Sequence, residues 1–154
     1  MFVITCTSRS GAVSEPGTVK VRELKKIHKF SHVMHLVSKV EGRIKKGMDA
    51  LDVIAASFPA GTLSGAPKIR AMEIIDEIET SRRGLYGGAI CAIDGHGNLD
   101  SCISIRMALL KDGVATVRAG AGVVFDSQPM KEAEETRHKA RNVLDAISLA
   151  EEGI

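Results

Sequence analysis

The segment RAGAGVVFDSQPMKEAEETRHK, residues 118–139, decides how the rest of this 154-residue sequence is interpreted. It begins as an apolar strand that Gly120 and Gly122 interrupt, and it then turns through DSQP at residues 126–129. Glycines in a strand allow another group to approach the backbone closely. The peptide N–H groups of this strand are therefore candidate donors to a bound anion.

The helix that follows the turn carries Glu132, Glu135 and Lys139. Side chains three and four residues apart share one side of a helix, so two carboxylates and an ammonium lie on one stripe. Together with the glycine strand they predict a site for a small carboxylate substrate and Mg²⁺. The alternative is that Glu135 and Lys139 form an ordinary ion pair on a solvated helix face.

Length and composition favour one compact domain with one core. Hydrophobic residues at 44% and charged residues at 26% exclude disorder as the main state. Four Phe, one Tyr and no Trp leave few stacking platforms for single-stranded nucleic acid. A net charge of +2 is close to balance, and the basic clusters at residues 20–29 and 43–46 are interpreted as solvated edges. No nucleic-acid partner is expected.

The three cysteines, Cys6, Cys91 and Cys102, lack the number and spacing of a disulfide framework or a zinc site. Reduced thiols favour a cytoplasmic protein. Residues 1–6 are apolar, but no basic leader precedes them and they are too few to span a bilayer. We expect a soluble protein without a membrane partner.

Hydrophobic periodicity predicts an α+β fold, in which antiparallel sheet layers have helices on the outside. The expected strands are 1–6, 30–37, 86–94, 100–111 and 114–125, and the expected helices are 48–58, 69–78 and 129–151. Strand 30–37 is expected to be buried on both faces, and the last three strands to form an antiparallel meander. The last helix is expected to face the core with Ala133, Thr136, Ala140, Val143, Leu144 and Ile147.

Three further side chains could carry chemistry. His35 lies between valines on one strand face and could transfer a proton, although a hydrogen-bonded core histidine is the commoner outcome. Arg106 lies in a strongly apolar strand, where a buried guanidinium must bind a ligand carboxylate or an internal acid. Tyr86 precedes two glycines and could bind a ligand or cap a loop. A helical metal site of His28, His32 and His35 is disfavoured because a strand separates these side chains.

Four segments resemble the C-terminal part of the chorismate-utilising enzymes, and within that family they are most similar to the synthase subunit of anthranilate synthase, component I. The segments are SHVMHLVS at 31–38, PAGTLSGAPKIRAM at 59–72, RGLYGGA at 83–89 and AGAGVV at 119–124. The similarity extends over residues 13–149, and residues 1–12 diverge. The GTLSG form at 61–65 favours anthranilate synthase over aminodeoxychorismate synthase, which usually has GSITG.

The resemblance implies a set of substrate-binding residues. Arg106 and Tyr86 match the residues that hold the enolpyruvyl or pyruvate group. Gly120 and Gly122 would give backbone N–H contacts to a substrate carboxylate, and Lys139 would neutralise one. The expected fold is correspondingly a partial chorismate-binding-enzyme fold over residues 1–154.

The resemblance also implies catalytic and metal-binding residues. His35 corresponds to the family histidine near the departing hydroxyl of chorismate, and Thr62 lies in the loop that lines the ring pocket. Glu135 matches a Mg²⁺ ligand, with Glu132 beside the metal as an acid, a base or a water-mediated ligand. We expect His35, Arg106 and the two glutamates to converge on one cavity.

The implied reaction adds ammonia to the chorismate ring and eliminates pyruvate, which gives anthranilate for tryptophan biosynthesis. A glutamine amidotransferase subunit would supply the ammonia, and Mg²⁺ would be the cofactor. Family members are several hundred residues long, and their additional N-terminal region carries a second pair of glutamates. Their Asp-x-x-Arg-Asn-Asp pattern is not kept at Ile4, Thr7, Ser8 and Arg9. Two hypotheses follow: a lyase completed by a separate chain, or a non-catalytic fragment that keeps the fold.

Overall fold

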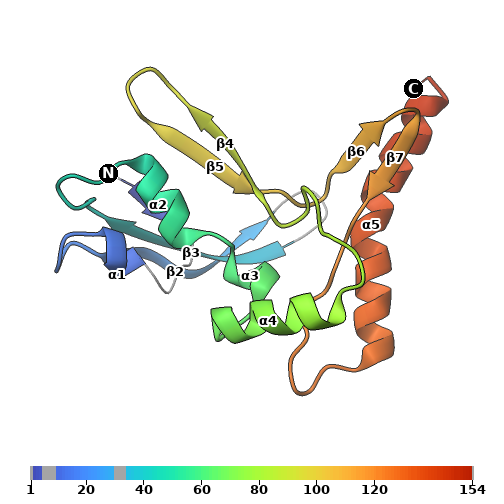
Figure 1. Cartoon of the computed structure of the whole chain (residues 1–154), viewed down its shortest axis with the longest axis horizontal. Coiled ribbons are helices and arrows are strands. Elements are labelled where there is room, and N and C mark those ends of the chain that lie inside the picture. Colours follow the sequence, from blue (N-terminus) through green and yellow to red (C-terminus); the bar gives the residue numbers. More distant parts are fainter. Residues whose placement is uncertain (1, 5–9, 30–33, 154) are drawn as a thin grey trace. The chain divides into compact units, whose positions relative to one another are not determined.

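The computed structural model describes residues 2–4, 10–29 and 34–153 (Figure 1). Helices alternate with short antiparallel strands, which confirms the predicted α+β class. The chain forms two compact units. The first comprises Met1–Ala60 and Ala92–Asp100, and the second comprises Gly61–Cys91 and Ser101–Ile154. That residues 1–154 form part of one chorismate-binding domain stays a prediction.

The first unit contains a three-stranded sheet in the order β1-β3-β2. Its strands are β1 (Phe2–Ile4), β2 (Lys20–Lys29) and β3 (Met34–Gly42). Both outer strands run antiparallel to β3, with Phe2 opposite Gly42 and His28 opposite His35. The predicted strand 1–6 is thus confirmed over Phe2–Ile4.

Two short helices complete this unit, α1 (Ser10–Val13) and α2 (Ala50–Ser57). Asp49 begins α2 because its carboxylate accepts the backbone N–H groups of Leu51 and Asp52, while the Asp52 carboxylate accepts that of Asp49. Such a reciprocal cap satisfies donors that a helix start leaves unpaired. The predicted helix 48–58 is confirmed, and it ends before Pro59 as expected.

The prediction that strand 30–37 is buried on both faces is wrong where it can be judged. Residues 30–33 lie outside the described residues, and the strand is described from Met34 onward. Met34 is 69% exposed and Leu36 is 71% exposed, because no described element covers these side chains.

The second unit carries α3 (Gly61–Ser64), α4 (Lys68–Ile78) and a long helix, α5 (Pro129–Glu151). The predicted helices 69–78 and 129–151 are confirmed. The strands β6 (Ala108–Lys111) and β7 (Val114–Val117) form an antiparallel hairpin, and α5 packs against β7. Another pair, β4 (Ala89–Ile93) and β5 (Leu99–Ile103), forms a second hairpin, whose tip belongs to the first unit.

The expected three-stranded meander is therefore two separate hairpins. Predicted strand 100–111 is interrupted between Ile103 and Ala108, and predicted strand 114–125 ends at Val117. The interruption has a local cause. Backbone N–H groups of Gly87 and Ser104 donate to the carbonyls of Ser104 and Gly88, at 2.9 and 2.8 Å, and so tie residue 104 to another segment.

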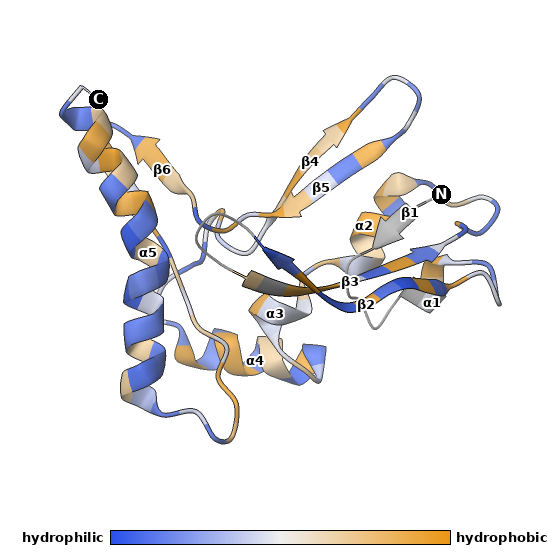
Figure 2. Ribbon diagram, turned by 180° about the vertical axis from the view of Figure 1, so that it is seen from behind, coloured by the Kyte–Doolittle hydropathy of each residue, from blue (hydrophilic) through white to orange (hydrophobic). Residues whose placement is uncertain are grey.

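Helix α5 presents a half-buried stripe along its length. The half-buried residues include Ala133, Thr136, Ala140, Val143 and Ile147, as the periodicity predicts, whereas Leu144 is 48% exposed. Figure 2 shows hydrophobic residues distributed among hydrophilic ones along this helix. One face of α5 therefore packs on the second unit, and the rest is polar.

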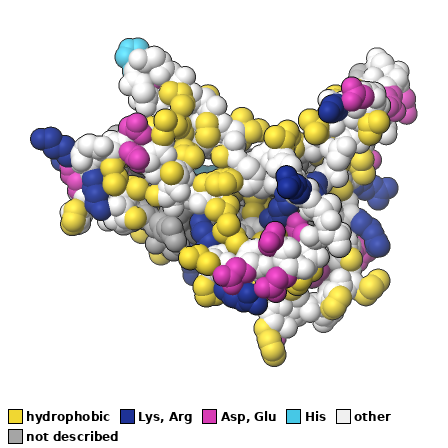
Figure 3. Space-filling model, in the orientation of Figure 1, with side chains coloured by type: hydrophobic (Ala, Val, Ile, Leu, Met, Phe, Trp, Pro, Cys, Tyr) yellow, Lys and Arg dark blue, Asp and Glu magenta, His cyan; other side chains and the backbone are white. Residues whose placement is uncertain are grey.

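Few side chains in the described part of the chain are fully covered. The buried hydrophobic residues there are Val13, Ala50 and Val53, all in the first unit. Large apolar side chains are exposed on most elements, and Figure 3 shows them at many places on the visible face. Among the helices described, none has the length and apolar character that crossing a bilayer requires.

The exposed apolar side chains predict self-association, since burying such surface is favourable. Light scattering at high micromolar concentration should detect oligomers of the wild-type chain. Leu36→Lys and Leu110→Lys, one in each unit and both more than 70% exposed in the wild type, should reduce the oligomer fraction without loss of folding. Thr116→Lys adds the same charge at an exposed polar position and is the control. A strictly monomeric wild type would contradict this prediction.

Candidate functional site

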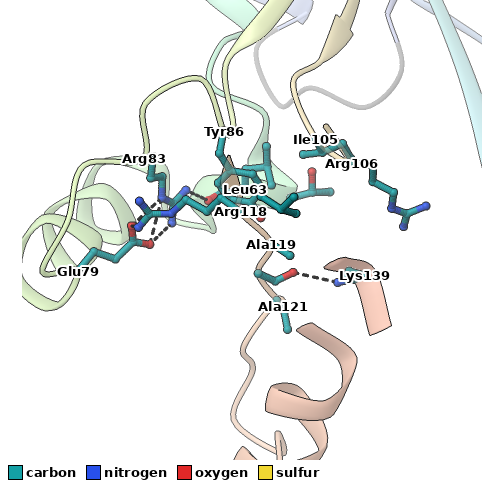
Figure 4. Close-up of a pocket in the computed structure, with 14 residues that line it drawn as sticks. Leu63, Glu79, Arg83, Tyr86, Ile105, Arg106, Arg118, Ala119, Ala121 and Lys139 are labelled. Atoms are coloured by element: carbon teal, nitrogen blue, oxygen red, sulfur yellow. Dashed lines mark hydrogen bonds and ion pairs between the residues drawn. The ribbon is translucent and has the colours of Figure 1, made fainter. Parts of the chain in front are cut away.

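The second unit encloses a cavity of about 310 Å³ (Figure 4). Every wall residue belongs to this unit. The cavity is lined by Thr62, Leu63, Glu79, Arg83, Tyr86, Ile105, Arg106, Val117, Arg118, Ala119, Gly120, Ala121, Gly122 and Lys139. Among the residues predicted for the site, the structure brings six together here, namely Thr62, Tyr86, Arg106, Gly120, Gly122 and Lys139. Their individual roles stay predictions.

Positive charge dominates the lining. Arg83, Arg106, Arg118 and Lys139 contribute cations, and Glu79 is the acidic side chain among the lining residues. A partly enclosed surface of one sign attracts ligands of the opposite sign. The cavity is therefore suited to an anion that carries more than one charge.

Two of the arginines bind the same carboxylate. Arg83 Nε donates to both oxygens of Glu79 at 3.0 Å, and Arg83 Nη2 donates to Oε1 at 2.5 Å. Arg118 Nη2 donates to Glu79 Oε2 at 3.1 Å. Hydrogen bonds from Arg83, together with the charges of Arg83 and Arg118, hold the pKa of Glu79 below its ordinary value against the opposing effect of burial.

Arg83 also contacts two other walls of the cavity. Its Nη1 donates to the carbonyl of Leu63 in α3 at 2.8 Å, and its guanidinium lies 5.9 Å from the centroid of the Tyr86 ring. A cation at that distance over an aromatic face is attracted to it. Arg83 thus connects α3 to the ring of Tyr86, and Thr62 lies in this short helix rather than in the expected loop.

Arg106 differs from its prediction. The residue lies in the interruption between β5 and β6, with φ of 53°, and not in a strand. Its side chain is exposed, so the expected buried guanidinium is wrong. Arg106 makes no hydrogen bond or ion pair with any residue that the structure describes. A non-glycine residue at positive φ is uncommon and is often found at functional sites.

Gly120 allows Tyr86 to approach the backbone. A Cβ at residue 120 would lie 3.0 Å from the Tyr86 hydroxyl, closer than side chains normally approach. Segment 118–122 follows β7 as a loop, so the predicted glycine-interrupted strand is wrong in its secondary structure. The close approach that the glycines were expected to allow is present at Gly120, whereas a Cβ at Gly122 would meet no described atom within 4 Å.

The same loop offers donors without acceptors. Within the described ranges, the amides of Gly120 and Gly122 find no hydrogen-bond acceptor. Lys139 Nζ donates to the Gly120 carbonyl at 3.1 Å and forms an ion pair with Glu135 at 2.5 Å. Since an ammonium has three donors, Lys139 retains one for a ligand.

Glu132 and Glu135 lie on α5 but do not line the cavity. The pairing of Glu135 with Lys139 is the surface ion pair that the alternative interpretation predicted, although Lys139 also reaches the cavity wall. Over residues 2–4, 10–29 and 34–153, no three His, Cys, Asp or Glu side chains gather into a group that could hold a metal ion. Two carboxylates do not complete the octahedral oxygen shell of Mg²⁺. These residues alone do not form a Mg²⁺ site.

His35 lies in β3 of the first unit, opposite His28. Its side chain lies outside the described residues, so its proton-transfer role stays a prediction. The expected convergence of His35 and Arg106 on one cavity likewise stays a prediction.

Sequence reasoning missed Glu79, Arg83 and Arg118. The four-residue spacing of Glu79 and Arg83 in the sequence indicated a local ion pair. Nothing in the sequence indicated Arg118, which is 39 residues from Glu79. A shared carboxylate between such distant residues becomes visible only in the fold.

The cationic cavity, in a mixed helix and antiparallel-strand fold, defines a domain suited to an anionic ligand. The chain belongs to the chorismate binding enzyme family, whose model matches residues 1–145.

Its relatives include anthranilate synthase component 1 of Neisseria meningitidis serogroup B, with 53% identity over 94% of this chain and 29% of the relative. Anthranilate synthase component 1 of Mycobacterium tuberculosis is 56% identical over 92% of this chain and 27% of the relative. The expected resemblance to anthranilate synthase component I is thereby confirmed. The chain spans less than a third of the length of these relatives.

Solved structures agree. Anthranilate synthase component I from Streptococcus pneumoniae TIGR4 superposes with a TM-score of 0.83 at 46% identity, over 86% of this chain and 31% of that one. A structure from Bacillus anthracis, described as a 2,3-dihydroxybenzoate-specific isochorismate synthase, gives a TM-score of 0.79 at 28% identity, over 90% of this chain and 37% of that one. The fold is therefore shared by family members that carry different names.

The pH dependence of stability should change in Glu79→Gln. Because Arg83 and Arg118 lower the pKa of Glu79 in the folded chain, its carboxylate stabilises the fold above the ordinary glutamate pKa of about 4.3, and this stabilisation is lost as pH falls through the folded-state pKa. Wild type and variant should differ in free energy of unfolding at pH 7 and converge as the pH falls below about 4. Urea unfolding at several pH values, followed by the fluorescence of Tyr86, the single tyrosine, would measure the free energy of unfolding of the wild type and of the variant. A difference that is constant with pH would contradict the prediction.

Proposed function

We propose that the cavity of the second unit binds chorismate and that the chain provides this site to an anthranilate synthase. The observation that carries the proposal is the cavity lining, which combines a guanidinium without a described partner, an ammonium and two glycine amides without described acceptors. Membership of the chorismate binding enzyme family supports the choice of ligand.

Chorismate is a dianion, with one carboxylate on the ring and one on the enolpyruvyl group. Arg106 and Tyr86 would hold the enolpyruvyl carboxylate, since no described residue accepts from the planar fork of donors on Arg106. The amides of Gly120 and Gly122 and the remaining donor of Lys139 would bind the ring carboxylate. Two sets of donors, one for each carboxylate, would thereby fix the orientation of the ring.

The proposed reaction forms a bond between the nitrogen of ammonia and a ring carbon, and the ring hydroxyl leaves as water. Loss of a ring proton and cleavage of the bond between ring carbon and enolpyruvyl oxygen then give anthranilate and pyruvate. His35 would donate a proton to the departing hydroxyl, and Glu132 would serve as an acid or base. The proposed activity also uses Mg²⁺, which Glu135 and Glu132 would help to bind. The substrate or another polypeptide would have to supply its remaining oxygen ligands.

The proposal includes partners. Ammonia would come from a glutamine amidotransferase subunit, the product would serve tryptophan biosynthesis, and the cytoplasm is the expected location. The chain spans 29% of a curated relative, and its described residues do not complete a metal site. We therefore expect the chain by itself to bind ligand without catalysing the reaction, unless a separate chain supplies the rest. Synthesis of aminodeoxychorismate is the alternative activity.

Arg106→Gln should weaken chorismate binding about tenfold, because the substitution removes a charge-assisted pair with a carboxylate. Titration of the 15N-labelled chain with chorismate would give the dissociation constant from the amide shifts of Gly120 and Gly122. Arg70→Gln removes an exposed arginine in the same unit that binds only Glu73 and Glu77, and it should not change the affinity. Equal affinities of the wild type and Arg106→Gln would argue against the assigned role.

Activity should depend on added polypeptide. Anthranilate fluorescence from chorismate, Mg²⁺ and an ammonium salt should stay at background with the chain alone. It should rise when a fragment covering the N-terminal region of a homologous component I is added, and at low chorismate concentration Arg106→Gln should reduce the rise. Product from the chain alone would overturn the expectation that this chain is incomplete.

A further inference from the structure

We propose that Glu79 is a positioning residue of the chorismate site: its carboxylate joins the cavity wall that holds Tyr86 and Arg106 to the wall that holds the amides of Gly120 and Gly122. This inference rests on the proposed function and extends it to a residue that would not touch the substrate's reacting atoms.

The first step is the position of Glu79 between two guanidiniums. Glu79 follows the last turn of α4, and its backbone N–H donates to the carbonyl of Ile75 at 2.8 Å. The helix end thus fixes the carboxylate, which receives three hydrogen bonds from Arg83 and one from Arg118. Figure 4 shows both arginines gathered at Glu79, on the side of the cavity away from the ends of Arg106 and Lys139.

The second step is the connection to the aromatic wall. The Arg83 guanidinium lies over the face of the Tyr86 ring, and the Arg83 backbone carbonyl accepts the Tyr86 N–H at 3.1 Å. The chain continues to Gly87 and Gly88, whose hydrogen bonds with Ser104 hold the segment that leads to Arg106. Ser104 is only 3% exposed, so this junction is well packed.

The third step is the connection to the amide wall. Arg118 Nη1 donates to the Arg82 carbonyl at 2.5 Å, and Nη2 donates to the Ser81 carbonyl at 3.2 Å. Arg118 begins the loop of Gly120 and Gly122, so its guanidinium fixes the start of that loop. Through Arg83 and Arg118, Glu79 therefore helps to fix the segment of Tyr86 and Arg106 relative to the loop of Gly120 and Gly122, which the Tyr86 hydroxyl also approaches directly.

Glu79 also directs the charge of the cavity. It offsets one of the two positive charges of Arg83 and Arg118 and engages donors of both, so that Arg106 and Lys139 are the cations more available to a ligand. Without that negative charge, Arg83 and Arg118 would repel each other and compete for the anion. A dianion that needs both walls should then lose affinity, whereas a monoanion that needs one cation should not.

Glu79→Gln tests the proposal, since glutamine has the same shape and keeps the packing while removing the charge. The 15N-labelled full chain would be titrated with chorismate and, separately, with benzoate as a monoanionic probe. We expect chorismate to bind about tenfold more weakly and benzoate to change less than about twofold. Before any ligand is added, the amides of Thr62, Leu63 and Gly120 should already shift from their wild-type positions.

Glu77→Gln is the matched control, because Glu77 lies on the same helix and pairs with the exposed Arg70 outside the cavity. It should leave the amide shifts and both affinities unchanged. An equal loss for chorismate and benzoate in Glu79→Gln would indicate general unfolding of the site and would overturn the proposal. Unchanged affinities and shifts would overturn it as well.

Two further outcomes separate the inference from the proposed function. If the wild type does not bind chorismate, the proposed function fails, and the amide shifts of the unliganded variant still decide whether Glu79 positions the two walls. If Glu79→Gln does not fold, Arg118→Gln removes one connection only. It should shift Gly120 and Gly122 while Thr62 and Leu63 keep their positions, and unchanged amide shifts of Gly120 and Gly122 would overturn the proposal.

Discussion

The shared carboxylate of Glu79 is the interaction on which the candidate site depends. In the described part of the second unit no large apolar side chain is fully buried, so hydrophobic packing alone does not fix the cavity walls. An exposed ion pair stabilises a protein by about 0.2–1 kcal/mol, which is too little to hold a fold together. Its effect here is geometric. Arg83 and Arg118, from segments far apart in the chain, are brought to one carboxylate that the end of α4 holds in place.

That arrangement also explains how a cavity with four cations can be selective. Two of the cations bind Glu79 and backbone carbonyls, and they act as structural elements. Arg106 and Lys139 remain, one without a described partner and one with a donor to spare. Two cations favour a ligand with two negative charges over a simple monoanion. The positive φ of Arg106 contributes to this arrangement, because it bends the backbone and interrupts the strand in the cavity wall.

The sequence predicted the residues of this site better than the secondary structure that surrounds them. Helix α5 and its half-buried stripe followed from helical spacing, and the close approach at Gly120 followed from the lack of a side chain there, both of which are local. Strand β2 was missed because its many basic residues hide any apolar alternation, and its pairing with β3 defines it. The break around Arg106 was missed because apolar residues surround it, as in a continuous strand. Hydrogen bonds of Ser104 to a segment 16 residues away impose the break.

The exposed apolar residues affect the stability of the elements that carry the site. Leu24, Ile27 and Leu36 on the first sheet, and Leu110 on β6, are each 65% exposed or more. Covering a side chain of this size contributes about 1.5–3 kcal/mol, more than any single ion pair of the cavity. The stability of the chain is therefore tied to what covers these faces, whether a second copy or another polypeptide. A polar network such as that of Glu79 can set the shape of the cavity only after this larger hydrophobic term has fixed the elements that carry it.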